Sequence, residues 1–140
     1  MRSSKAKKKK KEPIWLTEEI LFIVHAQQIE RYGGVHGVLD ENVVLAALQR
    51  PISRWLYEKS ADFADLAALY LVAFAGTQGF NDGNKRTGLA CALVFLALNS
   101  VSFEADPTEL YDLTLRVATH QIGDNEAAIW LRERLLKHKS

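Results

Sequence analysis

Two cations follow a glycine-containing turn at residues 80–87, which read Phe-Asn-Asp-Gly-Asn-Lys-Arg-Thr. Apolar segments on both sides predict helices, so the turn leads into a helix N-terminus. The first amides of a helix lack internal partners and the helix dipole is positive there, which favours an anion. Lys85 and Arg86 add two full positive charges. The pattern predicts a phosphate-binding site, although a polar helix cap with a solvated charge pair would have the same sequence.

Asp82 is an acid beside these cations. In a nucleotide site, such a carboxylate holds Mg²⁺, which binds through one or two carboxylates together with phosphate oxygens. The four histidines have no metal-site spacing, so a structural zinc is not expected. The single cysteine, Cys91, is interpreted as a small core residue.

The chain resembles the Fic/Doc family, whose pattern is His-x-Phe-x-Asp/Glu-Gly/Ala-Asn-Lys/Gly-Arg. Residues 80–86 match this pattern in register from Phe80 onward. Further similarity lies in residues 31–34, 70–73, 93–96 and 112–114, so the resemblance covers roughly residues 17–136. It implies a compact, all-α Fic-like bundle of about six helices, with the motif loop between two central helices.

Two residues favour one branch of that family. The AMP-transferring branch resembles Gly-Asn-Gly-Arg-x-x-Arg, whereas this chain has Lys85 and Leu89 in place of the second glycine and second arginine. Both differences favour the Doc branch, the toxins of type II toxin–antitoxin modules that phosphorylate a threonine of elongation factor Tu. This resemblance implies ATP or another nucleoside triphosphate with Mg²⁺, a translation factor as protein substrate, and an antitoxin whose disordered C-terminal segment binds a groove. AMP transfer remains an alternative.

The resemblance also assigns roles within the loop. Asp82 would hold Mg²⁺, and Gly83 would permit the tight turn. The phosphate-binding set would be Gly83, Asn84, Lys85, Arg86 and Thr87, and the catalytic positions would be Gln78, Asp82, Lys85 and Arg86. Phe80 is interpreted as a buried anchor that holds the loop on the core.

The family's histidine should stand at position 78, where this chain has Gln78. A glutamine amide can orient a hydroxyl but cannot accept its proton at neutral pH. Since general-base catalysis is worth about 10²–10⁴-fold, transfer should be slow while nucleotide binding persists. Three interpretations remain open: an inactive form, natural or engineered, that binds antitoxin or nucleotide; an enzyme that uses Asp82 or a histidine brought in by folding; or a transfer that needs little help from a base.

Among the histidines, His25 is expected to be structural and His36, in a glycine-rich loop, could approach a ligand. His120 lies near a helix end, where the dipole favours a cation. The expected helices cover residues 17–32, 41–50, 62–77, 84–99, 107–119 and 124–137, with residues 52–60 as a loop or short helix. Pro51 is expected to end the second helix. The helix over 84–99 is apolar on nearly every side, which predicts burial in the middle of the bundle.

Charge divides the 140-residue chain unevenly. Seven of its 18 basic residues lie in the first eleven positions, and the remainder carries 11 basic against 17 acidic residues, a net charge of −6. We expect a basic, disordered arm over residues 1–12 and a Fic/Doc domain over residues 13–140. Nucleic acid could bind only through the arm. Without a long apolar run or a signal peptide, the protein is expected to be cytoplasmic, with no membrane partner.

Overall fold

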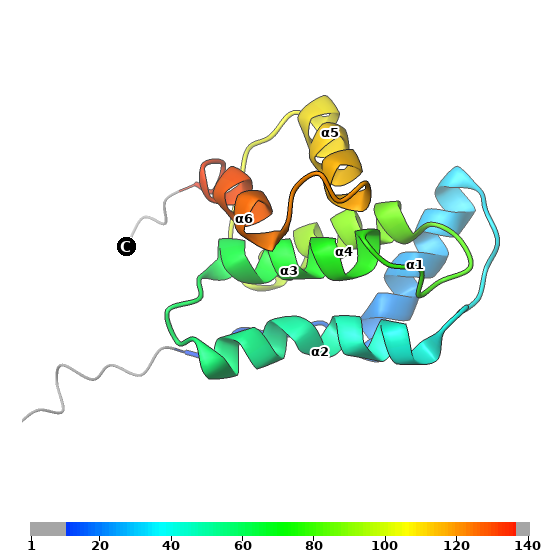
Figure 1. Cartoon of the computed structure of the whole chain (residues 1–140), viewed down its shortest axis with the longest axis horizontal. Helices are drawn as coiled ribbons and strands as arrows, with labels where there is room; N and C mark the ends of the chain where they lie inside the picture. Colours follow the sequence, from blue (N-terminus) through cyan, green and yellow to red (C-terminus); the bar gives the residue numbers. More distant parts are fainter. Residues whose placement is uncertain (1–10, 137–140) are drawn as a thin grey trace, which may run out of the picture.

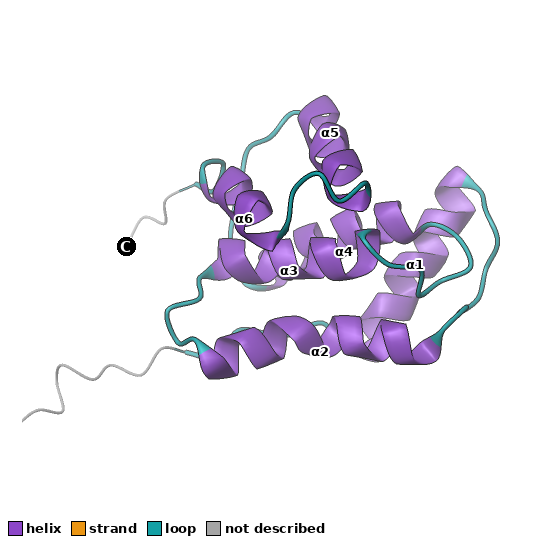
Figure 2. Ribbon diagram, in the orientation of Figure 1, coloured by secondary structure: helices purple, strands orange, loops and turns teal. Residues whose placement is uncertain are grey.

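The computed structural model describes residues 11–136. Helices make up its regular structure there (Figures 1 and 2): α1 (Glu18–Tyr32), α2 (Glu41–Tyr57), α3 (Phe63–Ala75), α4 (Asn84–Leu98), α5 (Pro107–Ala118) and α6 (Asp124–Arg132). Extended pairing within the described range consists of two isolated bridges, Val38 with Phe80 and Phe103 with Leu135. The expected all-α fold is confirmed.

Helix α3 lies at the centre of the bundle, between α2 on one side and α5 and α6 on the other, with α4 behind it (Figure 1). Ten of its thirteen residues are buried, and Asp65 is its single charged residue. The sequence predicted this fully buried position for α4, and that prediction was wrong. Helix α4 keeps a half-buried flank that includes Leu89, Ala90 and Leu93, and this flank lines a groove.

Helices α3 and α4 cross closely at Gly88. A Cβ atom on Gly88 would lie 2.7 Å from the backbone nitrogen of Ala75 and 2.9 Å from the carbonyl oxygen of Leu71. Neither backbone atom can move without shifting α3, so this crossing requires glycine. The close contact fixes the relative position of α3 and α4, and therefore the position of the loop that joins them.

Three helices begin where their capping residues predict. The side chains of Thr17, Asp40 and Asp106 accept hydrogen bonds from amides of the first turns of α1, α2 and α5, at 3.1, 3.3 and 2.8 Å. Each cap satisfies a donor that has no partner inside the helix. These helix starts are therefore confirmed.

Helix α2 continues through Pro51 to Tyr57, so the predicted end at Pro51 was wrong. A proline inside a helix costs about 3 kcal/mol relative to alanine. The buried residues of α2 lie along one face: Val44, Ala47, Leu48, Pro51 and Trp55. Burying a single large apolar side chain contributes about 1.5–3 kcal/mol, so this face offsets the missing hydrogen bond. Residues 52–57, expected to be a loop or short helix, thus extend α2.

Helix α6 ends at Arg132, five residues before its expected end. The chain then runs beside residues 102–104, because Glu104 donates its amide to the Arg134 carbonyl at 2.9 Å and Leu136 donates to the Ser102 carbonyl at 2.8 Å. The predicted basic arm falls almost entirely on residues 1–10, outside the described range. None of the described helices is long and apolar enough to cross a membrane.

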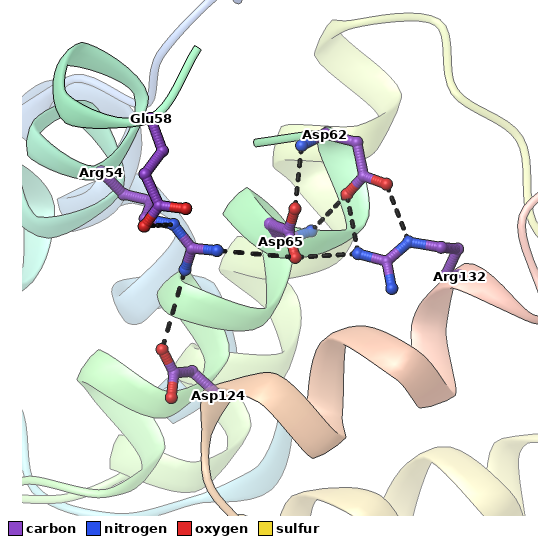
Figure 3. Close-up of polar contacts among 6 residues, drawn as sticks. All are labelled: Arg54, Glu58, Asp62, Asp65, Asp124 and Arg132. Atoms are coloured by element: carbon purple, nitrogen blue, oxygen red, sulfur yellow. Dashed lines mark hydrogen bonds and ion pairs between the residues drawn. The ribbon is translucent and has the colours of Figure 1, made fainter. Parts of the chain in front are cut away.

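A network of charged side chains joins α2, α3 and α6 at one end of the bundle (Figure 3). Arg132 of α6 contacts Asp62 and Asp65 at the start of α3, both at 2.8 Å. Arg54 of α2 contacts Glu58 at 3.0 Å and lies 3.9 Å from both Asp65 and Asp124. These ion pairs lie on elements far apart in sequence, so they help fix how the three helices pack.

Candidate phosphate-binding site

The loop over residues 76–83 joins the two helices that cross at Gly88. Gly83 stands at the N-cap of α4 with φ of 74°, a left-handed conformation that side chains rarely adopt. No side chain caps this helix, so the amides of its first turn are available to an anion. This helix start therefore differs from those of α1, α2 and α5.

A polar hollow of about 380 Å³ lies over this uncapped helix start. Its walls come from the end of α3, the loop, the first turn of α4 and the last residue of α5: Ala75, Thr77, Gln78, Asn81, Asp82, Gly83, Asn84, Lys85, Arg86 and Ala118. The fold thus brings Gln78, Asp82, Lys85 and Arg86 to one concave surface. Thr87 does not line the hollow, because its side chain is completely buried.

Asn84 closes the loop on itself. Its side-chain oxygen accepts from the Phe80 amide at 2.9 Å, and its side-chain nitrogen donates to the Phe80 carbonyl at 3.0 Å. Both atoms of the side-chain amide are therefore used within the loop. Asn84 can still offer a phosphate its backbone amide and the second N–H of its side-chain nitrogen.

Phe80, within the loop, and His25, on α1, anchor the loop to the core. Phe80 is fully buried, and the His25 ring stacks on it with centroids 3.8 Å apart. The His25 Nε2 atom lies 2.9 Å from the Asp82 carbonyl oxygen. Burial lowers the pKa of His25, and the hydrogen bond to that carbonyl opposes the effect only partly. His25 is therefore neutral near pH 7 and donates its Nε2–H to the loop.

Sequence reasoning treated His25 as structural but did not connect it with the loop. Residues 25 and 80 lie far apart in sequence, and helical spacing says nothing about which loop a side chain will meet. The contact between His25 and the loop depends on the packing of α1 against α4. The sequence indicated that His36 could approach a ligand. His36 is exposed, and its carbonyl oxygen accepts a hydrogen bond from the Asn81 side chain at 3.1 Å.

Asp82 is half-buried and lines the hollow. Its Oδ1 accepts from the Gly83 amide at 2.8 Å, and its Oδ2 accepts from the Val35 amide at 3.3 Å. The described residues contain no group of three or more metal-binding side chains. A single carboxylate still fits Mg²⁺, since that ion commonly takes one or two protein carboxylates and completes its shell with phosphate oxygens and water.

The two cations of the motif lie in different surroundings. Arg86 donates to the Gly33 carbonyl at 3.0 Å and to the Gln28 carbonyl at 3.5 Å, and its guanidinium lies 5.4 Å from the Tyr32 ring centroid. It therefore joins α4 to the C-terminal end of α1. Lys85 is exposed and forms no hydrogen bond or ion pair with the described part of the chain, so its charge is available to a ligand.

Lys85 and Arg86 also border a second, apolar groove of about 610 Å³ between α1, α4 and α5. Its floor is the half-buried flank of α4, and Tyr32 and Tyr111 stand on its sides. The polar hollow and the apolar groove therefore share the two cations of the motif. Gln78 lies away from the groove, exposed within the hollow.

Two comparisons with known proteins bear on this site. The model of the Fic/DOC family matches residues 15–96, which include the whole loop and most of α4. The chain is also 41% identical over 117 residues to a protein of Escherichia phage P1 named "Protein kinase doc". That match covers 84% of this chain and 92% of the phage protein.

Proposed function

The chain belongs to the Fic/Doc family, and from this premise we propose that it is a Doc-type toxin that transfers the γ-phosphoryl group of ATP, or of another nucleoside triphosphate, to a protein hydroxyl. The acceptor is a translation factor such as elongation factor Tu, which places the action in the cytoplasm. The observation that carries the proposal is the uncapped start of α4, where Lys85 and Asp82 line one polar hollow.

The residues of the hollow divide the work of binding. The first amides of α4 and the Lys85 ammonium neutralise the phosphate chain. Arg86, held against α1, adds fixed positive charge at the border between hollow and groove. Asp82 would hold Mg²⁺, which when bound neutralises charge on the phosphate oxygens. Phosphoryl transfer depends mainly on such positioning and charge neutralisation.

Gln78 limits the reaction at the proton-transfer step. It lines the hollow at the position of the family's histidine, and its amide can orient the acceptor hydroxyl. It cannot take the hydroxyl proton. We therefore expect transfer that is slower than a histidine-containing form by up to about 10²–10⁴-fold.

The apolar groove beside Lys85 and Arg86 is the proposed seat of the antitoxin segment. Such a segment would lay an apolar helix face along α4, a common mode of peptide recognition. The two cations at its border would favour acidic residues at one end of the segment. An antitoxin seated there would also lie next to the hollow.

The activity test compares this chain with Gln78→His. Purified elongation factor Tu is incubated with γ-labelled ATP and each protein, and growth inhibition is measured in parallel. We expect Gln78→His to label the acceptor faster and to inhibit growth more strongly, and the double variant Gln78→His/Lys85→Ala to lose this gain. A folded Gln78→His protein that transfers no label would refute the kinase proposal. Label transferred from α-labelled ATP would favour AMP transfer instead.

A second candidate function rests on Gln78 alone. Without the family's base, the protein could bind nucleotide or antitoxin with no turnover. This binding-module hypothesis predicts calorimetric binding of Mg·ATP or of the antitoxin segment together with absent label transfer by the unaltered chain. Failure to bind either would exclude it.

A further inference from the structure

His120 adopts a left-handed backbone conformation, which is uncommon outside glycine. Its φ is 61°, and in the described chain it shares a positive φ outside glycine only with Ser100, at 59°. The His120 amide donates to the Val117 carbonyl at 3.0 Å, and the Gln121 amide donates to the Arg116 carbonyl at 2.9 Å. This pair of bonds ends a helix with one left-handed residue, which is usually glycine. A side chain in this conformation is disfavoured relative to glycine.

No hydrogen bond or ion pair of the His120 side chain with the described residues explains why a histidine occupies this position. Its side chain is exposed, and its ring forms no hydrogen bond with the described part of the chain. The helix dipole at the end of α5 would favour any cation and does not require a histidine. An uncommon conformation together with an ionisable side chain that has no hydrogen-bonding partner among the described residues makes His120 a candidate for a functional role.

The His120 ring lies beside the loop that forms one wall of the phosphate hollow. Its Cε1 atom is 3.6 Å from the position that a Cβ would occupy on Gly76. Ala75 and Thr77, the two neighbours of Gly76, line the hollow, as does Ala118 two residues before His120. Gln78 follows Gly76 by two residues, a separation of at most about 7 Å along the chain. The imidazole therefore lies next to the segment that carries Gln78, although His120 itself is not among the residues that line the hollow.

We propose that His120 is the general base that serves this chain in place of a histidine at position 78. The inference rests on the proposed function and adds a catalytic residue to it. The acceptor hydroxyl oxygen attacks the γ-phosphorus and forms the new O–P bond. The bond from the γ-phosphorus to its bridging oxygen breaks, and the nucleoside diphosphate leaves with that electron pair. The hydroxyl proton passes to the His120 imidazole and then to water.

The variant His120→Gly separates this role from a structural one. Glycine removes the imidazole and also relieves the left-handed strain, so the melting temperature should stay the same or rise. Transfer of label from γ-labelled ATP to elongation factor Tu should nevertheless fall, by about 10²–10⁴-fold in kcat with little change in the KM for ATP. A structural role for His120 would not produce this combination.

Ser100→Gly is the matched control, because Ser100 ends α4 with the same pair of backbone bonds. Its amide donates to the Ala97 carbonyl at 3.0 Å, and the Val101 amide donates to the Leu96 carbonyl at 2.9 Å. It lies at the end of α4 opposite the loop. Ser100→Gly should change the melting temperature as His120→Gly does while leaving the transfer rate unaltered.

A rescue experiment completes the test. The double variant Gln78→His/His120→Gly should recover transfer, since it restores a base at the family's position. Transfer by His120→Gly at the unaltered rate would overturn the inference. So would transfer by Gln78→His but not by the unaltered chain, an outcome that leaves the proposed function intact. Absence of transfer from both folded proteins would refute the proposed function itself.

Discussion

Lys85 and Arg86 are neighbours in sequence but contribute differently. Arg86 is bound to carbonyl oxygens at the end of α1, whereas Lys85 extends into solvent at the hollow. A guanidinium in such contacts stabilises both the fold and a bound ligand. A free ammonium affects the binding of the ligand alone. The two residues should therefore be separable by stability measurements.

We expect Arg86→Ala to lower the free energy of unfolding by about 1–2 kcal/mol, because it removes a charged hydrogen bond to Gly33 and the contact with Tyr32. Lys85→Ala should leave that free energy within about 0.5 kcal/mol of the original. Urea denaturation of both variants measures the difference. Equal stability of the two variants would contradict the different roles assigned to the cations.

Asp82→Asn keeps the size of the side chain and removes its charge. In the unaltered chain, Mg²⁺ should increase the affinity for ATP relative to the same titration in EDTA. The variant should show little or no such increase, because the carboxylate that would hold the ion is gone. Calorimetric titrations with and without Mg²⁺ give the comparison. An unchanged response to Mg²⁺ would remove Asp82 from the metal site.

At the scale of single helices, the sequence predicted the starts better than the ends. Thr17, Asp40 and Asp106 mark their helices because a cap acts within one turn. The predicted end at Pro51 was wrong because a helix tolerates proline where burial of its apolar face offsets the lost hydrogen bond. Helix α2 buries that face against α3. The end of α6 depended on pairing with residues 102–104. Local signals cannot report such tertiary contacts.

At the crossing of α3 and α4, a Gly→Ala substitution should have the opposite effect on stability from its usual effect in a helix. In an exposed helix, Gly→Ala stabilises by about 1 kcal/mol. At Gly88, the added Cβ would meet backbone atoms of α3 at 2.7 and 2.9 Å, and overpacking of this kind costs about 1–3 kcal/mol. We expect Gly88→Ala to lower the melting temperature.

Ala97 provides the control for that substitution. It is an exposed position on the same helix, so Ala97→Gly should show only the ordinary cost of glycine in a helix, about 1 kcal/mol. If Gly88→Ala raised the melting temperature, the close helix crossing would be incorrect. The loop geometry built on that crossing would then need revision.

For the molecule as a whole, the charged network of Figure 3 links stability to pH. Burial raises the pKa of Asp62, but hydrogen bonds from the Arg132 guanidinium and the Asp65 amide outweigh burial. The net effect lowers this pKa to about 2. Because the folded pKa lies below the ordinary 3.8, the stabilisation is present above about pH 4. It is lost as the pH falls towards 2.

Arg132→Met should therefore destabilise the protein at pH 7 by up to about 1 kcal/mol, since the pair is partly exposed. The difference from the unaltered chain should shrink as the pH is lowered from 4 towards 2. Urea midpoints across this range provide the measurement. Arg116→Met is the control, because its 4.0 Å pair with Asp112 is solvent-exposed and should matter little at any pH. A difference that grew on acidification would contradict the assignment.

The sequence predicted the family, the all-α fold and the loop to be examined, because the motif is contiguous. It could not predict that Asn84 binds the Phe80 backbone, that His25 supports the loop or that His120 reaches Gly76. The contacts of His25 and His120 join the loop region to side chains whose positions depend on the packing of helices. The bonds between Asn84 and Phe80 join residues four apart and depend on the conformation of the turn between them. The sequence therefore supplied the candidate residues of the motif, of which Thr87 does not line the hollow. The contacts of each residue required the structure.

The central claim is that the hollow over the start of α4 binds the phosphates of a nucleotide. Isothermal titration of Mg·ATP into the unaltered chain and into Lys85→Ala tests it most directly. The account predicts saturable binding to the unaltered chain, similar affinity for Gln78→His, and an affinity at least about tenfold lower for a Lys85→Ala protein of unchanged stability. Equal affinity for the unaltered chain and Lys85→Ala, or no binding to either folded protein, would contradict it.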